Sequence, residues 1–338
     1  MKPGTRQNQP TNPLFYHFRR NPLAVSLSDR ATLLFLTSRQ RRFTKGAVST
    51  RLGVFRHGIA INLDLSSTSD FRFFESMCTS GYEEETIALF SRLVHEGDVC
   101  VDVGANRGYL ALIMARLVGP AGLVHCFEPG RRALGDLENN IRLNLERTSL
   151  LAKMLIHPIA VSDRPGNLLL FSSRTDMSED STTSFFSSPG VQVKTERLDD
   201  VLNGLFPIRL VKIDAEGSEL AVLRGMKETI RNNPDLYILI EWNRGYTTSA
   251  LWTILAEGFD IFRVIDRDAG PTLLRVSSPS ELGGANLVCL GKSASPAARE
   301  SLLRLLRQDH PTTKPSFLKT GFEMLDRAAS RILGPRVG

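Results

Sequence analysis

Short apolar runs alternate with longer amphipathic segments through the middle of the chain. The runs are rich in Val, Ile and Leu, and they are too short to form helices. Between them, apolar residues recur every three or four positions, as they do on one face of a helix. The pattern predicts strands at 99–103, 123–127, 155–161, 210–213, 236–240, 259–265 and 286–290. It predicts helices at 83–94, 109–118, 131–145 and 218–230.

This alternation predicts the fold class. Strands that alternate with helices form a mainly parallel sheet that is covered by helices on both faces. We therefore expect a doubly wound α/β domain over residues 53–296. A β-hairpin is expected at 53–75, with Gly58 in its turn, because apolar and other residues alternate after this glycine. The Ser- and Thr-rich segment 172–190 is expected to be a long irregular loop, either a lid or an insertion without function.

The two ends of the chain have a different character. Residues 1–52 form a basic arm whose first part, rich in Pro, Asn, Gln and Thr, is expected to be disordered. Residues 297–338 are expected to form a tail of two amphipathic helices divided by Pro311, docked on the main domain. Basic residues are concentrated at both ends, so the net charge of +6 conceals an acidic middle.

The charge, the cysteines and the apolar runs limit the class of protein. Basic arms attract nucleic acid or anionic lipid, but charged segments are more often solvated surface, so we expect a solvated surface and no nucleic-acid partner. No apolar run reaches the 20 or so residues that span a membrane, and no signal-peptide pattern is present. Cys100 and Cys126 lie in predicted strands and are expected to be buried free thiols. These features favour a cytoplasmic protein.

A glycine-containing turn between the first predicted strand and its helix indicates a nucleotide-type ligand. The segment 102–108 has the spacing D-x-G-x-x-x-G, and the following helix offers free N–H groups at its start. The dinucleotide fingerprint G-x-G-x-x-G needs a middle glycine that is absent here. Asp102 would repel a pyrophosphate, whereas it would attract the ammonium and sulfonium groups of S-adenosylmethionine. Glu128 ends the next strand, where it is expected to accept both ribose hydroxyls.

Acidic residues also follow later strands, at the edge of a parallel sheet where ligands bind. Asp214 is the predicted general base for a hydroxyl nucleophile. Lys212 lies two residues earlier and is expected to share the face of Asp214, where it pairs with a carboxylate or orients the substrate. Glu216 is a further candidate, with a structural role equally open. Glu219 is expected to be an exposed acid at a helix N-terminus.

A metal ion is not predicted. Asp214, Glu216 and Glu241 offer oxygen ligands suited to magnesium, but Glu241 has an alternative role as a cap or as the partner of Arg244. The six histidines show no ligand spacing.

Several of these segments together resemble the FkbM family of methyltransferases. The resemblance covers about residues 58–290 and rests on the segments Asp102-Val-Gly-Ala-Asn-Arg-Gly108, Phe127-Glu-Pro129, Lys212-Ile-Asp-Ala-Glu-Gly-Ser-Glu219, Gly81-Tyr-Glu-Glu-Glu85 and Leu223-Arg-Gly225. It implies a class I methyltransferase-like, Rossmann-like fold. It also implies transfer of a methyl group from S-adenosylmethionine to a hydroxyl of a sugar, a glycan or a natural-product-like small molecule.

The resemblance also implies roles for residues of this chain. Those assigned to the cofactor are Asp102, Gly104, Ala105, Asn106 and Gly108 for the methionine portion, Glu128 for the ribose, and Ala160 or Ser162 for the adenine. The candidates for catalysis are Asp214, Glu216 and Lys212. Arg107 departs from the family pattern, and beside a cationic cofactor it is expected to point away, toward an anionic substrate.

Two other classes of function stay open at this point. A dinucleotide-dependent oxidoreductase is opposed by the missing glycine and by Asp102, and the test is whether NAD binds. A non-catalytic nucleotide-binding module is opposed by the intact 102–108 turn. A nucleic-acid methyltransferase is a lesser variant, suggested only by the basic arm, and would show strongly salt-dependent binding. The sequence predicts neither the methyl acceptor nor the oligomeric state.

Overall fold

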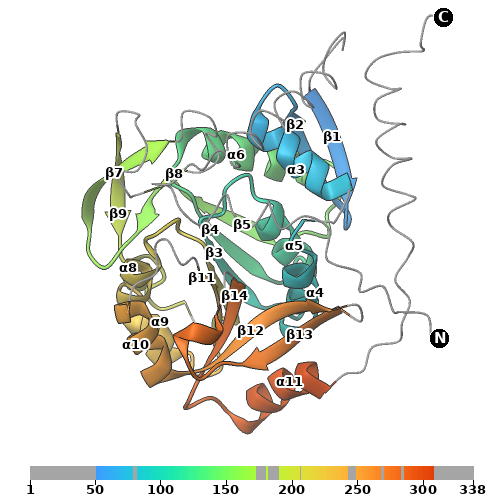
Figure 1. Cartoon of the computed structure of the whole chain (residues 1–338). Coiled ribbons are helices and arrows are strands. Elements are labelled where there is room, and N and C mark those ends of the chain that lie inside the picture. Colours follow the sequence, from blue (N-terminus) through green and yellow to red (C-terminus); the bar gives the residue numbers. More distant parts are fainter. Residues whose placement is uncertain are drawn as a thin grey trace, which may run out of the picture.

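A sheet of eight strands forms the centre of the protein (Figure 1). The computed structural model describes residues 51–78, 82–172, 180–181, 190–205, 207–242, 249–267, 270–282 and 285–307. In spatial order the strands are β13 (Gly270–Arg275), β12 (Phe259–Arg267), β14 (Ala285–Gly291), β11 (Tyr237–Trp242), β10 (Leu210–Ile213), β3 (Val99–Val103), β4 (Leu123–Phe127) and β5 (Lys153–His157).

The sheet is doubly wound and mainly parallel. Strands β11, β10, β3, β4 and β5 pair in parallel, whereas β14, β12 and β13 pair with antiparallel neighbours. The strand order reverses between β3 and β10, so the chain passes from one half of the sheet to the other at this point. Such a reversal opens a crevice beyond the carboxyl ends of the strands, which is where open α/β sheets bind ligands. The predicted fold class is confirmed.

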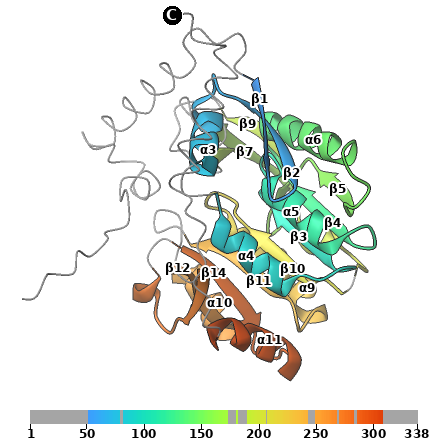
Figure 2. The same ribbon diagram turned by 90° about the vertical axis from the view of Figure 1, so that its right-hand side faces the viewer.

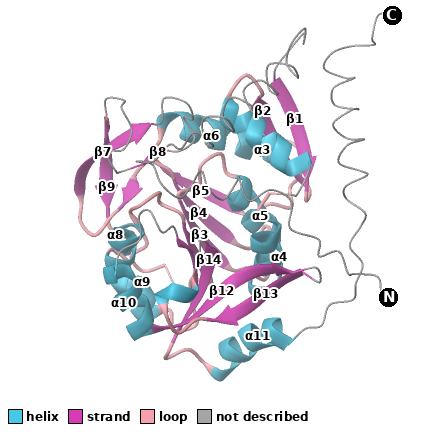
Figure 3. Cartoon of the chain, in the orientation of Figure 1, coloured by secondary structure: helices cyan, strands magenta, loops and turns pink. Residues whose placement is uncertain are grey.

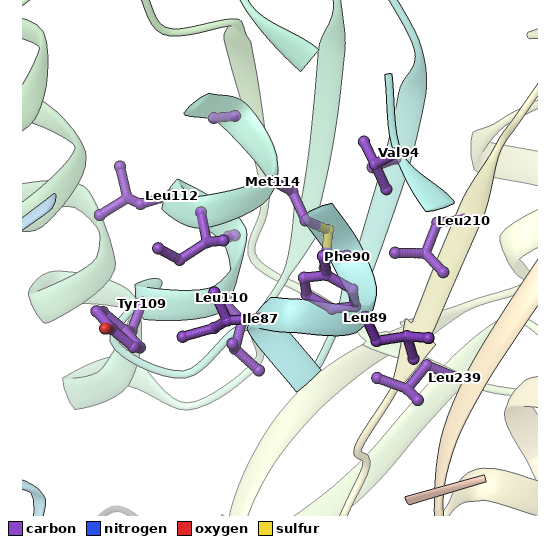
Figure 4. Packing of buried hydrophobic residues seen from close by; sticks show 14 of the residues in the cluster. Ile87, Leu89, Phe90, Val94, Tyr109, Leu110, Leu112, Met114, Leu210 and Leu239 are labelled. Carbon is purple, nitrogen blue, oxygen red and sulfur yellow. The ribbon is translucent and has the colours of Figure 1, made fainter. Parts of the chain in front are cut away.

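Helices bury both faces of this sheet, which explains why its central strands are continuously apolar. One face packs against α4 (Glu84–Leu93), α5 (Tyr109–Val118), α6 (Arg131–Leu145) and α11 (Pro296–Arg307). The other face packs against α7 (Leu198–Val201), α8 (Glu219–Arg224), α9 (Lys227–Asn232) and α10 (Ser249–Gly258). Figure 4 shows the first layer, where Phe90 and Met114 lie between the helices and Leu210 and Leu239 of the sheet.

The predicted hairpin is shorter than the alternation suggested. Strands β1 (Arg51–Arg56) and β2 (Ile59–Asp64) pair around a turn that contains Gly58, whose φ is 77°. Beyond them the chain forms helix α3 (Thr68–Cys78), so the prediction of a hairpin to residue 75 was wrong. The backbone N–H of Asp64 donates to Asp70 Oδ2 at 2.7 Å, which closes the turn between β2 and the helix. Figures 1 and 2 place this hairpin beside α6, and α3 packs against β2.

A second, smaller sheet lies beside the main one (Figure 3) and was not predicted. Its strands are β6 (Ala160–Val161), β9 (Val191–Glu196), β7 (Gly166–Ser172) and β8 (Asp180–Ser181). The expected single strand 155–161 is instead divided between β5 and β6, because Pro158 has no N–H for a continuous ladder. Most of the expected loop 172–190, namely 173–179 and 182–189, lies outside the described residues.

The remaining differences concern helices. The expected helix 218–230 is divided into α8 and α9 at Gly225, where a Cβ atom would lie 2.0 Å from the carbonyl oxygen of Ser162. Strand β13, helix α10 and the short 3-10 helix Pro279–Glu281 were not predicted. Of the predicted tail, α11 is described, whereas everything beyond residue 307 lies outside the described residues.

Two simpler expectations can be compared directly with the structure. Cys100, Cys126 and Cys289 are free and buried, as predicted for the first two. None of the helices in the described part of the chain combines the length and the apolar character that crossing a membrane requires. The proposed division at residues 52 and 296 stays a prediction.

Candidate functional site

A pocket of about 690 Å³, including its open mouth, lies beyond the carboxyl ends of β3, β4 and β10, where the strand order reverses. Its polar residues come from the turns that follow these strands, and its apolar residues come from β3, β4, β6, β7, α6 and the turns beside the strands. It is lined by Val103, Gly104, Asn106, Phe127, Glu128, Pro129, Ala133, Ile159, Ala160, Val161, Leu170, Asp214, Ala215, Glu216 and Ser218. Its mixed lining, mainly apolar with a few converging polar groups, is typical of small-molecule sites.

Glu128 links the turn after β3 to the turn after β4. The N–H of Asn106 donates to its Oε2 at 2.8 Å, and the N–H of Gly130 donates to its Oε1 at 2.7 Å. The side chain is buried, with 6% exposed, yet it contributes to the pocket wall. A carboxylate oxygen has more than one acceptor position, so both oxygens retain the capacity to accept a ligand hydroxyl.

The glycines of this turn allow close contacts with other parts of the protein. Gly104 has φ 77°, and a Cβ atom there would lie 1.9 Å from the carbonyl oxygen of Asp214. Gly108 has φ 87°, and its Cβ would lie 2.4 Å from Leu137 Cδ1. Neither Gly108 nor Ala105 lines the pocket. Gly104 and Gly108 therefore allow close packing against the turn after β10 and against helix α6, and Gly104 also lines the pocket.

Asp102 lies beneath the pocket rather than in its wall. Its side chain is fully buried, and Lys212 Nζ lies 3.2 Å from its Oδ1 and 3.6 Å from Asp214 Oδ2. The predicted pairing of Lys212 with a carboxylate is therefore present. One cation is shared by two carboxylates, which leaves a net negative charge. The expected direct contact of Asp102 with a ligand is not supported, because Asp102 is not among the pocket residues.

Burial and charge act in opposite directions on the pKa values of this pair. Burial raises the pKa of Asp102, and the charge of Lys212 opposes that shift. Burial alone would lower the pKa of Lys212, but the charges of Asp102 and Asp214 outweigh it and raise this pKa above its usual value. Lys212 is therefore an ammonium at neutral pH, fixed between its two acidic partners.

A glutamate of α8, the helix that follows it, stabilises the turn after β10. Glu219 is only 4% exposed and accepts the N–H groups of Ala215 and Gly217, each at 3.1 Å. The expectation of an exposed acid there was wrong, because the side chain folds back under the turn. Burial raises its pKa, and the backbone hydrogen bonds oppose the shift. Glu216 has φ 46°, a left-handed conformation that costs energy for a residue with a Cβ atom.

Three carboxylates converge at this edge of the sheet. One oxygen each of Asp214, Glu216 and Glu241 lies within 4.8 Å of the others, and all three residues are partly exposed. Glu241 belongs to β11 rather than following it, and its suggested partner Arg244 lies outside the described residues. These oxygens are the donor set that would hold a divalent cation if one were required. That no metal is needed stays a prediction.

Glu83 is a residue near this edge to which sequence reasoning gave no role. It precedes α4 with φ 55°, and its Oε2 accepts hydrogen bonds from Thr86 Oγ1 at 2.7 Å and from Asn286 Nδ2 at 3.1 Å. Asn286 lies opposite Glu241 in the pairing of β14 with β11. The charge of Glu83 also raises the pKa of Lys212. The Gly-Tyr-Glu-Glu-Glu segment was the available signal, but Lys212 and Asn286, with which Glu83 interacts, are more than 120 residues away.

Arg107 points away from the pocket, as expected, but not toward a substrate. Its Nη1 lies 2.9 Å from Asp70 Oδ1, and its guanidinium lies 4.9 Å from the ring centre of Phe73. Its carbonyl oxygen accepts from Asn140 Nδ2 at 2.9 Å. The suggested contact with an anionic substrate is corrected: Arg107 is buried and connects the turn after β3 to α3 and α6.

The fold and the pocket define a Rossmann-like α/β protein with a pocket at its topological switch point, the usual place for a ligand in such folds. Comparison with known families is more specific. Residues 102–262 match the methyltransferase FkbM domain, and the resemblance is confirmed over these residues.

The curated relatives are distant. The 2-O-methyltransferase NoeI of Sinorhizobium fredii is 29% identical over 44% of this chain and 65% of its own length, slightly less than two thirds. The methyltransferase sdnD of Sordaria araneosa is 28% identical over 48% of this chain and 74% of its own length. A solved methyltransferase FkbM from Methylobacillus flagellatus matches with 15% identity and a TM-score of 0.38, covering 77% of this chain and 60% of that one.

Proposed function

We propose that this protein transfers a methyl group from S-adenosylmethionine to a hydroxyl of a sugar, a glycan or a natural-product-like small molecule. The observation that carries the proposal is the set Asp102, Lys212 and Asp214 at the switch point, in which Asp102 and Lys212 are buried and Asp214 lines the pocket. Its net negative charge favours a cationic sulfonium and opposes the pyrophosphate of a dinucleotide. The FkbM domain match and the printed name of NoeI support the same reaction type.

The two halves of the pocket fit different parts of this cofactor. Gly104 and Asn106 form the wall beside the charged set and are assigned to the methionine portion. Glu128 faces the pocket with both oxygens on backbone donors, and these oxygens would accept the ribose hydroxyls. The adenine is assigned to the apolar part of the wall, formed by Phe127, Ala133, Ile159, Ala160, Val161 and Leu170.

The cofactor supplies an electrophilic methyl group, and the residues of this chain hold the acceptor in line with it. Asp214 would accept the proton of the acceptor hydroxyl and so make its oxygen a better nucleophile toward that methyl group. Lys212 fixes the position of Asp214 from below, at 3.6 Å. Glu216 lines the same wall and would accept a second hydroxyl of the acceptor. Alignment of donor and acceptor supplies much of the acceleration in such a displacement.

Calorimetric titration tests this proposal. The full chain is titrated with S-adenosylmethionine and, separately, with NAD. Glu128→Gln serves as the site variant, and Glu138→Gln, an exposed acid on α6, serves as its matched control. We expect saturable binding of S-adenosylmethionine, weakened about tenfold or more by Glu128→Gln and unchanged by Glu138→Gln. Binding of NAD alone would make the oxidoreductase the function to pursue, and binding of neither would favour a non-catalytic module.

A further inference from the structure

A second, larger groove lies between β2, α3 and α6, next to the pocket. It encloses about 1580 Å³ of open space. It is lined by Asn62, Leu63, Asp64, Ser66, Ser67, Asp70, Arg132, Asp136, Asn139, Asn140 and Arg142. Only one of these residues, Leu63, is apolar. Its residues from β2 and α3 precede the FkbM match, which begins at residue 102, and none of its residues lines the proposed cofactor site.

The chemistry of the lining is mixed rather than of one charge. Arginine only donates hydrogen bonds, an ionised aspartate only accepts them, and asparagine and serine do both. An anion would face the carboxylates of Asp64, Asp70 and Asp136, and a cation would face Arg132 and Arg142. A hydroxyl group both donates and accepts, so a neutral ligand with many hydroxyls can use every kind of side chain in this groove.

Buried hydrogen bonds fix the floor of the groove. Asn140, which is 1% exposed, accepts from the N–H of Asn62 at 2.9 Å and donates to the carbonyl oxygen of Arg107. Asp70, which is 4% exposed, accepts from the N–H of Asp64 and pairs with Arg107. A site built on fixed polar groups loses less entropy on binding than one that must first become ordered.

Other polar groups of the wall are available to a ligand. Asp136 is half-buried, and no hydrogen bond or ion pair joins it to another residue in the described ranges. Arg132 lies one helical turn before it and is exposed, and it too has no such partner in that part of the chain. Together they present an acceptor and a donor on the same stretch of α6.

The groove and the pocket come near each other along two stretches of the chain. On α6, Arg132 lines the groove and Ala133 lines the pocket. In the turn after β3, Asn106 lines the pocket, while Arg107 bonds to Asp70 in the groove. A ligand in the groove therefore lies over the first half of α6, beside the proposed cofactor.

We propose that this groove binds a neutral saccharide and holds sugar units of the acceptor beyond the one that receives the methyl group. This inference rests on the proposed function for the role of the ligand, but its binding part can be measured alone. It assigns to the acceptor the class of hydroxyl-rich, uncharged oligosaccharides, and it makes Asp136 and Arg132 specificity-determining residues.

Saturation-transfer NMR on the full chain, followed by calorimetry, tests this assignment. The neutral probes are maltotetraose, xylotetraose and chitotetraose, and the charged probes are tripolyphosphate and spermidine. We expect at least one tetrasaccharide to bind in the millimolar range or tighter, and we expect Asp136→Ala or Arg132→Ala to weaken it at least fivefold. Glu138→Ala, on the same helix outside the groove, is expected to leave binding unchanged.

The assignment is overturned if no tetrasaccharide binds, if only a charged probe binds, or if binding is indifferent to both groove variants. The titration with S-adenosylmethionine separates this result from the proposed function. A protein that binds the cofactor but no saccharide would refute the groove assignment alone. A protein that binds a saccharide through Asp136 but not S-adenosylmethionine would refute the proposed function and leave the saccharide site in place.

Discussion

Two turns meet at the edge of the sheet, one after β3 and one after β10. Their backbone geometry is similar, but the residues that stabilise them come from different elements. Each has a residue with positive φ, Asn106 in the first and Glu216 in the second. Each has three backbone N–H groups that donate either to a buried glutamate or to a carbonyl oxygen of a neighbouring strand. The first turn, however, uses Glu128 from the neighbouring strand, whereas the second uses Glu219 from its own helix.

The two glutamates therefore have different roles at the same edge of the sheet. Glu128 belongs to the pocket wall, so the residue that orders the first turn is also available to a ligand. Glu219 lies outside the pocket and only supports the turn that carries Asp214 and Glu216. Two contacts join the turns: the approach of Gly104 to the backbone of Asp214, and the ammonium of Lys212 between Asp102 and Asp214.

The largest expected effect comes from breaking the backbone contact between the turns. In Gly104→Ala the new Cβ would meet the carbonyl of Asp214 at 1.9 Å, and the residue would also need a positive φ. We expect the free energy of unfolding to fall by about 3 kcal/mol or more, measured by urea denaturation. Gly135→Ala is the matched control, since its Cβ would have no neighbour within 4 Å and lies inside α6. It should stabilise the protein by about 0.5–1 kcal/mol.

The second effect comes from removing the shared cation. Lys212→Met leaves Asp102 buried without its ammonium, and we expect a loss of about 3–5 kcal/mol at neutral pH. In the variant the pKa of Asp102 lies still further above its unfolded value. The unfolded chain then releases the proton first as pH rises, so stability falls with increasing pH above about 4.

The same pH series on the unmodified protein is the control for this prediction. Its Lys212 has a raised pKa, so the stabilisation from this lysine persists through neutral pH and is lost only as pH rises above the usual lysine value of about 10.4. A variant whose stability is independent of pH between 4 and 8 would show that Asp102 does not depend on Lys212.

Replacing the two glutamates separates their tasks. Glu128→Gln and Glu219→Gln each remove a charged acceptor from two backbone donors, and each should cost about 1–3 kcal/mol of stability. Only the first should weaken binding of S-adenosylmethionine, because only Glu128 lines the pocket. Equal loss of affinity in both variants, measured by calorimetry, would contradict the division between the turns.

The smallest effects concern the two left-handed residues. Glycine adopts this conformation freely, so Glu216→Gly should raise the free energy of unfolding by up to about 1 kcal/mol. Asparagine already tolerates it, and its Oδ1 accepts from the N–H of Arg107 at 2.8 Å. Asn106→Gly should therefore lower stability by a few tenths to about 1 kcal/mol. Thermal unfolding measures both, and a destabilised Glu216→Gly would mean that its side chain stabilises the turn.

The sequence predicts the central sheet well because its strands are buried on both faces. Strands β3, β4 and β10 and helices α5 and α6 have the predicted bounds, since apolar period and turn residues agree there. The small sheet escaped prediction because its strands are short or exposed, as Val191 at 59% illustrates. The break of the helix at Gly225 depends on Ser162, which lies in a distant part of the chain.

In the candidate site, too, the features with local sequence signals were predicted and the features that depend on packing were not. The segments that hold Glu128 and Asp214 were identified from strand ends and glycine spacing, which are local signals. The sequence could not show that Asp102 lies beneath the pocket, that Glu219 is buried, or that Arg107 bonds to Asp70. Each of these facts depends on which elements pack together, and a single sequence carries no direct record of that packing.

A crystal structure of the protein with S-adenosylhomocysteine tests the central claim most directly. The account predicts the ribose hydroxyls within hydrogen-bond distance of Glu128, the adenine against Phe127 and Ala160, and the sulfur on the side of Asp214. It also predicts that Lys212 stays between Asp102 and Asp214. Density for the ligand anywhere else, or a ligand in this pocket whose ribose avoids Glu128, would contradict the account.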